Sequence, residues 1–162
     1  CYRYVALSHR CGACQHFTTK LANVAKFKHG IKFDDLPKTF QDAVSLARHL
    51  GFVHMWIDAL CIIQDSAQDW LQESRKMGYI FMDAEVIFAI HCAKDGSDGF
   101  LNGSLSKCHA ISYHALGGTV GICRPLEPER EIMSSDLSRR GWVLQERFLS
   151  CRTLHFLPGQ VY

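Results

Sequence analysis

Large apolar residues along this chain gather in four runs, at residues 4–8, 53–63, 86–90 and 152–157. Aliphatic and aromatic side chains dominate the first three runs, whereas residues 152–157 also contain Arg152, Thr153 and His155. A strand with one solvent-exposed face alternates apolar and polar residues, whereas near-continuous apolar runs indicate strands buried on both faces. The chain is therefore expected to build a sheet that helices cover on both sides.

Two stretches between these runs repeat their apolar positions at helical spacing. In the first, Pro37 suits the opening turn of a helix and Gly51 can close it. In the second, Ser66 with Asp69 three residues later is typical of a capped helix start. The apolar positions are Phe40, Val44, Ala47 and Leu50 in the first helix, and Trp70, Met77 and Phe81 on one stripe of the second.

Strands and helices alternate along the first half of the chain. This β-α-β-α-β order predicts a three-layer α/β fold, with a mostly parallel sheet of four or five strands and right-handed crossovers. The first strand is expected between the second and the third. Residues 11–35 are interpreted as a long loop, and residues 93–136, rich in glycine, as a long insertion with one short strand near 119–123. Helical spacing returns at residues 137–148.

Length and charge narrow the class of protein. The 162 residues favour a single domain over residues 1–162, with a sizeable core. Because the chain begins at Cys1 rather than methionine, we expect a fragment of a longer, multidomain protein. The formal net charge of +2 and the lack of a long basic run give no support to nucleic-acid or membrane binding through bulk charge. No stretch reaches the roughly 18 apolar residues of a membrane span.

Eight cysteines are scattered along the chain. Cys61, Cys92 and Cys151 lie in or beside apolar runs, where a free thiol behaves as a small core hydrophobe, so we expect reduced thiols in a cytoplasmic protein. Cys11 and Cys14 form a C-x-x-C motif, which leaves a redox motif and a zinc site open as alternatives. Candidate zinc ligands besides these cysteines are His16 and the distant pair Cys108 and His109, but the second C-x-x-C that is typical of a structural zinc site is missing. We therefore expect no bound metal and no required disulfide.

One acid interrupts the second apolar run. Asp58 lies within the sequence WIDALCIIQD at residues 56–65, and a buried carboxylate is costly unless it is hydrogen-bonded or used. Ligands of open parallel sheets bind at the carboxyl ends of the strands. The expected crevice therefore lies beside residues 8–12 and the loop at 63–68.

The first strand ends in Ser8, His9 and Arg10. Backbone N–H groups and an arginine at such a turn are suited to a phosphate group. This makes the turn a candidate part of a nucleotide site.

Three segments of the chain resemble the ordered motifs of the fungal heterokaryon-incompatibility (HET) domain. They are YVALSHRCG at residues 4–12, WIDALCIIQD at 56–65 followed by a further Asp-Trp pair, and RRGWVLQER at 139–147. His9 and Cys11 stand where the family pattern has tyrosine and tryptophan. The resemblance covers nearly the whole chain and implies a role in non-self recognition and programmed cell death.

The strand order and the closing motif are also similar to those of the TIR domain, a flavodoxin-like fold of innate immunity and cell-death signalling. In both, a late helix carries a tryptophan and, four residues on, a glutamate, here Trp142 and Glu146. The resemblance implies that Glu146 is catalytic in cleaving the nicotinamide–ribose bond of NAD, which is then a substrate rather than a cofactor. The residues implied to bind that substrate are Ser8, His9, Arg10, Asp58 and Trp142.

The residues themselves leave alternatives open. Glu146 has arginines nearby in the sequence and fits an ordinary surface ion pair. Asp58 fits a structural role, in which it accepts backbone N–H groups and fixes the next loop together with Asp65. The whole domain also fits a non-enzymatic module that oligomerises or recruits partner signalling domains.

Overall fold

The computed structural model describes residues 2–10, 17–93, 99–101, 110–115, 118–123, 128–139, 149–158 and 160–162. No helix within these ranges has the length and apolarity needed to cross a membrane.

A five-stranded sheet forms the centre of the molecule, with the strand order β2-β1-β3-β6-β7. The first four strands in this order run parallel, and the short β7 pairs antiparallel with β6. The predicted parallel sheet is confirmed, as is the place of the first strand between the second and the third. The strands are β1 (Tyr4–Ser8), β2 (His54–Ile57), β3 (Val86–Ile90), β6 (Thr153–Leu157) and β7 (Gln160–Val161).

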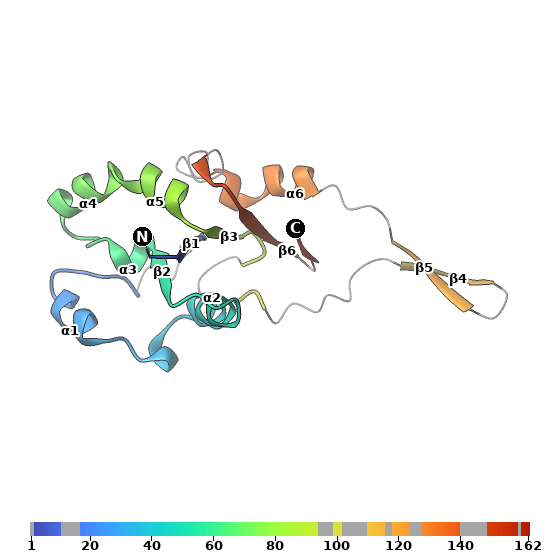
Figure 1. The fold of residues 1–162 in the computed structure, drawn as a ribbon, viewed down its shortest axis with the longest axis horizontal. Coiled ribbons are helices and arrows are strands. Elements are labelled where there is room, and N and C mark those ends of the chain that lie inside the picture. Colours follow the sequence, from blue (N-terminus) through green and yellow to red (C-terminus); the bar gives the residue numbers. More distant parts are fainter. Residues whose placement is uncertain are drawn as a thin grey trace.

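Helices cover both faces of the sheet, which makes the fold three-layered as predicted (Figure 1). Helices α1 (Val24–His29) and α2 (Lys38–His49) lie on one side. On the other side lie α4 (Ala67–Ser74), α5 (Met77–Asp83) and α6 (Pro128–Ser134).

Alternation within the strands explains why their runs are apolar throughout. In β1, Val5 and Leu7 pack in one cluster with residues of α2, whereas Ala6 packs in a second cluster with residues of α5. All five residues of β3 are buried, and they divide in the same way: Phe88 joins the α2 cluster and Ile87 the α5 cluster. Each strand therefore needs apolar side chains at successive positions rather than at alternate ones.

The first predicted helix is confirmed, except that Leu50, expected on its apolar face, lies just past its end and is 48% exposed. Helix α2 follows directly after Pro37, and it buries Phe40, Ala43 and Ala47 against the sheet. Gly51 takes the left-handed conformation with φ of +80° just past the end of the helix, and its N–H donates to the carbonyl of Arg48. This is the conformation for which glycine is favoured at a helix end.

The second predicted helix is in fact two. Residues 75–76 form a turn between α4 and α5, which changes the phase of the helical pattern. Met77 and Phe81 are buried, but Trp70 is 44% exposed, so the expected stripe through all three residues and the expected core position of Trp70 are wrong. Trp56 is half-buried and packs edge-on against Phe81, with 5.4 Å between ring centroids.

The predicted cap of α4 is confirmed, and it carries a testable prediction. The Oγ of Ser66 accepts the N–H of Asp69 at 3.2 Å. Replacing Ser66 with alanine should lower the free energy of unfolding by about 1 kcal/mol, because an N–H at the start of the helix loses its acceptor. Ser74→Ala at the other end of α4 is the matched control, with a change within about 0.5 kcal/mol. Equal urea midpoints for the two variants would show that the cap contributes nothing.

The second strand is shorter than predicted. It ends at Ile57 instead of continuing to residue 63, and the short helix α3 (Asp58–Cys61) follows. The carboxylate of Asp58 accepts the N–H of Ala59 at 2.7 Å, and its carbonyl accepts the N–H of Ile62 at 3.1 Å. These bonds turn the chain into a helix although the residues are apolar, so the pattern alone gave the wrong element.

The segment interpreted as a loop at 11–35 also contains helices. Residues 11–16 lie outside the described part of the chain, but α1 and a 3-10 helix, η1 (Phe33–Asp35), form within the remainder. This segment is held to α3 through Thr19, whose N–H donates to the carbonyl of Ala59 at 2.9 Å. Phe17 and Phe27 stack at 5.5 Å within it.

The insertion contains more regular structure than the single short strand predicted near 119–123. Two antiparallel strands, β4 (Ala110–Ala115) and β5 (Gly118–Cys123), form a hairpin that extends away from the sheet (Figure 1). Helix α6 and the 3-10 helix η2 (Asp136–Arg139) follow. The start of the helix predicted at 137–148 lies in η2, and residues 140–148 lie outside the described part of the chain.

Candidate functional site

The carboxyl ends of β1, β2 and β3 lie level with one another, and we call this boundary of the sheet the carboxyl edge. Where β1 pairs with β2, Leu7 lies opposite Ile57, and where β1 pairs with β3, Ser8 lies opposite Ala89. The residues that follow these strands therefore come together, although they lie far apart in the sequence. This is the place where parallel sheets of this class bind ligands.

Ser8 and His9 are held inside the protein at the carboxyl edge. Each is only 3% exposed. The His9 ring packs edge-on against Phe40 of α2, with 5.0 Å between ring centroids. Its Nδ1 lies 3.9 Å from Oδ1 of Asp58. The structure thus places two of the predicted site residues next to each other, beyond hydrogen-bond distance, with His9 on the side of the core.

Asp58 combines a structural bond with partial access to solvent. Its Oδ1 accepts the N–H of Ala59, and 22% of its side chain is exposed. The loop after α3 is fixed chiefly by two other acids: Asp69 accepts the N–H of Ile63 at 2.7 Å, and Asp65 accepts the N–H of Leu21 at 2.8 Å. The carboxylates of Asp69 and Asp65 thus fix the loop together with the carbonyl of Asp58, which accepts the side-chain amide of Gln64 at 3.1 Å.

Arg10 brings a distant segment to the carboxyl edge. Its Nη1 lies 2.6 Å from Oδ2 of Asp136 in η2, and the two side chains are 44% and 59% exposed. An exposed pair of this kind contributes only about 0–1 kcal/mol. Its importance is positional, because η2 directly precedes the segment that carries Trp142 and Glu146. No pattern in the sequence around Asp136 signals this contact.

Trp142 and Glu146 themselves lie outside the described residues. The residues that flank their segment are described, and both pack on the α5 side of the sheet. Leu137 is 2% exposed and packs against Ala89 of β3. The side chain of Leu149 lies close to Gly78 of α5: a Cβ atom added to Gly78 would be only 3.3 Å from Cδ1 of Leu149. The described residues on either side of this segment therefore lie at β3 and at α5.

The structure also contains a row of three hydrogen-bonded side chains, Ser135, His91 and His155, which the sequence did not predict. His91 follows β3, and its Nδ1 is 2.7 Å from the hydroxyl of Ser135 while its Nε2 is 3.0 Å from Nδ1 of His155. Both histidines are half-buried. The two residues are 64 positions apart and belong to no spacing motif, so only the pairing of β3 with β6 brings them together.

Two of the described cysteines differ from their expected role. Cys61 and Cys151 are exposed rather than part of the core, and Cys92 is half-buried. Burial raises the pKa of the Cys92 thiol. Within the described residues, no three His, Cys, Asp or Glu side chains gather as metal ligands do. Cys11 and Cys14 lie outside those residues, so the proposed absence of metal and disulfide stays a prediction.

Comparison with known proteins adds one finding. The family model described as "Heterokaryon incompatibility protein (HET)" matches residues 4–146, which is most of the chain. No curated protein and no solved structure gives a match.

Proposed function

The chain belongs to the heterokaryon incompatibility (HET) family, and from this premise we propose that it is a TIR-like effector that cleaves NAD at the carboxyl edge. Family membership supports a role in heterokaryon incompatibility. The proposal adds the chemistry: cleavage of NAD, or of a related nucleotide, in response to non-self recognition would lead to programmed cell death.

One observation carries the proposal. The sheet register brings Arg10 and Asp58 to a single edge, and the bond from Arg10 to Asp136 holds η2, which precedes Glu146 in the sequence, at the same edge. These residues come from three separate parts of the sequence. Their meeting at the carboxyl ends of parallel strands supports a ligand site more strongly than any one motif does.

Each residue has a distinct role in the proposed reaction. Arg10 exchanges its exposed partner Asp136 for the pyrophosphate of NAD, because a phosphate is a stronger partner for a guanidinium. Asp58 accepts a hydrogen bond from a ribose hydroxyl, while the buried Ser8 and His9 hold this edge in place. Trp142 lines the nicotinamide side of the site.

Glu146 faces the bond that breaks. The bond between nicotinamide N1 and ribose C1′ breaks, and its electron pair leaves with nicotinamide, which becomes neutral. Positive charge develops on the ribose, and the carboxylate of Glu146 stabilises it. Water then forms the new bond to C1′ and loses a proton to solvent, giving ADP-ribose.

The direct test is to incubate concentrated protein with NAD and follow nicotinamide release. The protein is tested alone and as a fusion to a dimerising helix, because activity that depends on assembly is missed in dilute monomer. The proposal predicts nicotinamide and ADP-ribose in equal amounts, with faster release by the fusion. If neither form releases nicotinamide above the buffer blank, this chain is not a NAD-cleaving enzyme.

A second function is favoured by one observation, the exposure of large apolar side chains on the outer helices. On α4 these are Trp70 and Leu71, at 44% and 52% exposure, and on α5 they are Tyr79 and Met82, at 66% and 42%. Apolar side chains of this size, where they gather on one face, are typical of surfaces that contact other proteins. A non-enzymatic module would use this surface for self-association or for partner signalling domains. It would still kill cells after Glu146 is replaced by glutamine.

A further inference from the structure

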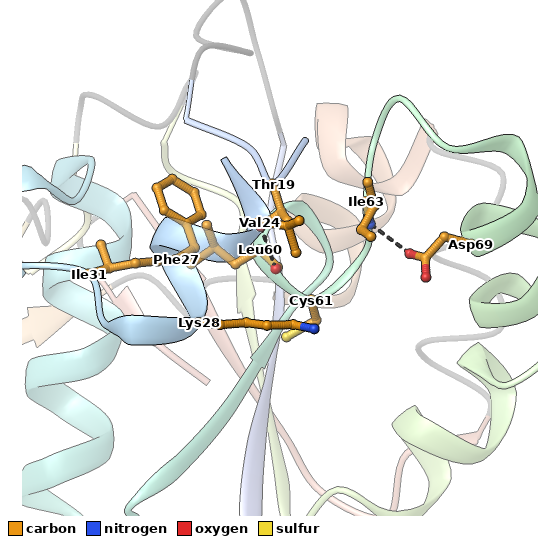
Figure 2. A pocket seen from close by; sticks show the side chains of 9 residues that line it. All are labelled: Thr19, Val24, Phe27, Lys28, Ile31, Leu60, Cys61, Ile63 and Asp69. Atoms are coloured by element: carbon orange, nitrogen blue, oxygen red, sulfur yellow. Dashed lines mark hydrogen bonds between the residues drawn. The ribbon is translucent and has the colours of Figure 1, made fainter. Parts of the chain in front are cut away.

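A pocket of about 300 Å³ lies between α1, α3 and the start of α4 (Figure 2). It borders the 63–68 loop, as the predicted crevice does, but Ser8, Arg10 and Asp58 do not line it. The side chains that line it are Thr19, Val24, Phe27, Lys28, Ile31, Leu60, Cys61, Ile63 and Asp69.

Backbone hydrogen bonds hold the walls of this pocket in place. Thr19, in the segment before α1, makes two of these bonds. Its N–H donates to the carbonyl of Ala59 in α3, and its carbonyl accepts the N–H of Gln64 in the loop after α3. On the opposite side, the carboxylate of Asp69 fixes Ile63 (Figure 2). The pocket is thus built from fixed backbone.

Most polar groups in the lining are already used. The hydroxyl of Thr19 donates to the carbonyl of Leu60 at 2.6 Å. The carboxylate of Asp69 accepts the N–H of Ile63 and lies in the first turn of α4, where backbone N–H groups offset a negative charge. Lys28 differs from both, because it makes no hydrogen bond or ion pair with the part of the chain that the structure describes. It reaches from α1 toward Cys61 of α3 (Figure 2).

The remaining lining is apolar. Phe27 of α1 and Ile31, which follows that helix, line the pocket together with Leu60 of α3, and Val24 and Ile63 complete the apolar part of the lining. The volume is at the lower end of the range for small-molecule sites. A partly apolar wall with a lysine whose charge pairs with no described residue suits a small ligand with an apolar body and one negative group.

We propose that this pocket binds a small amphipathic anion, an aromatic or branched carboxylate whose acid group pairs with Lys28 and whose apolar body packs on Phe27, Ile31 and Leu60. The inference does not depend on NAD cleavage, because none of the residues assigned to that reaction lines the pocket.

Cys61 provides a built-in reporter of occupancy. The residue is exposed, but its thiol lies at the pocket wall, where shielding from water raises its pKa and the negative charges of Asp58 and Glu73 raise it further. Alkylation of Cys61 by iodoacetamide is therefore slow enough to follow by peptide mass spectrometry. A ligand in the pocket slows it further by covering the thiol. Cys151 is exposed and lies outside the pocket, so it serves as the internal control.

The experiment compares three probes of one shape and different charge: 3-phenylpropionate, its neutral amide and 3-phenylpropylamine. The proposal predicts that at millimolar concentration only the carboxylate slows alkylation of Cys61, and that none of them changes Cys151. Lys28→Gln should weaken this protection by about tenfold or more, because it removes one charge-assisted contact. Lys26→Gln is the matched control, since Lys26 is an exposed lysine of the same helix that does not line the pocket.

The possible outcomes separate clearly. If all three probes protect Cys61 equally, the pocket is a purely apolar cavity and the assignment of an anion is wrong. The assignment is also wrong if no probe protects Cys61, or if Lys28→Gln retains the affinity of wild type. Because Lys28 is exposed, equal melting temperatures of both lysine variants and wild type should confirm that the fold is retained.

Discussion

Replacing Glu146 with glutamine is expected to abolish NAD cleavage and leave the melting temperature unchanged. Glutamine keeps the shape of the side chain and most of its hydrogen bonding, but it carries no negative charge. A charge that faces a developing cation in a water-poor site lowers the barrier by several kcal/mol, so the rate should fall by about a hundredfold or more. A surface ion pair, in contrast, contributes about 0–1 kcal/mol to stability and nothing to the rate.

The control for this variant is Glu129→Gln, which makes the same change of charge at an exposed position of α6. Its turnover and melting temperature should both match those of wild type. If wild type cleaves NAD and Glu146→Gln keeps most of the rate, Glu146 is not the catalytic carboxylate. Asp58 at the carboxyl edge is then the next residue to test.

Replacing Asp42 with alanine is expected to have the largest effect on stability. Asp42 belongs to α2 and is only 3% exposed. One carboxylate oxygen accepts the N–H groups of Phe100 and Leu101, at 2.8 and 3.0 Å, and the other lies 2.7 Å from Nζ of Lys38. Removing the carboxylate leaves buried donors without this acceptor, so unfolding should become easier by about 2–4 kcal/mol in urea titrations.

The backbone around this contact is shaped to fit it. Gly99 has φ of +69°, and a Cβ at this position would lie 2.7 Å from Oδ2 of Asp42. Lys38→Ala is the matched control, because it removes only the half-exposed partner of the carboxylate and should change stability by about 1 kcal/mol or less. If Asp42→Ala proves as mild as Lys38→Ala, the hydrogen bonds to residues 100 and 101 do not stabilise the fold.

Acid should remove the same contribution from the wild-type protein. Burial pushes the pKa of Asp42 upward, but the hydrogen bonds from Lys38, Leu101 and Phe100 outweigh it, so the pKa is lowered in the folded state. The stabilisation is therefore complete above about pH 5, beyond the unfolded pKa of about 3.9, and it is lost as the pH falls through the folded pKa. Asp42→Ala should lack this acid-dependent part of the stability.

The sheet could be predicted from the sequence because its strands are buried on both faces. All five residues of β3 are buried, because successive side chains pack on opposite faces of the sheet. Each of them is therefore apolar, and the run is easy to recognise in the sequence. The parallel direction of the strands followed from their alternation with helices, since a parallel connection needs a crossover. Helix α2 was equally readable, because Pro37 and Gly51 mark its two ends.

The wrong predictions arose where one hydrogen bond or one turn overrides a pattern. Residues 58–61 are apolar enough for a strand, but the bonds made by Asp58 start a helix. Trp70 has the spacing of a core residue, but the turn at 75–76 rotates α4 relative to α5 and leaves it exposed. Such local changes do not alter the periodicity on which the predictions rested.

Among the described residues, the sequence predicted only those site residues that lie at or directly after the end of a strand. Knowing that β1 and β2 are neighbours is enough to bring His9 and Asp58 together. The contact between Arg10 and Asp136 joins positions 126 residues apart, and no motif links them. Lys28 is similar, since its place in the pocket beside Cys61 becomes visible only when α1 is placed against α3.

The most direct test of the account is to locate bound NAD by hydrogen exchange. Glu146→Gln is the suitable protein, because it should bind NAD without consuming it. The account predicts slower amide exchange on addition of NAD in peptides that cover residues 8–10 and 58–64, at the carboxyl edge. Peptides from α1, which lines the other pocket, should not change. Unchanged exchange at both parts of the carboxyl edge, or protection confined to another part of the molecule, would contradict the proposed NAD site.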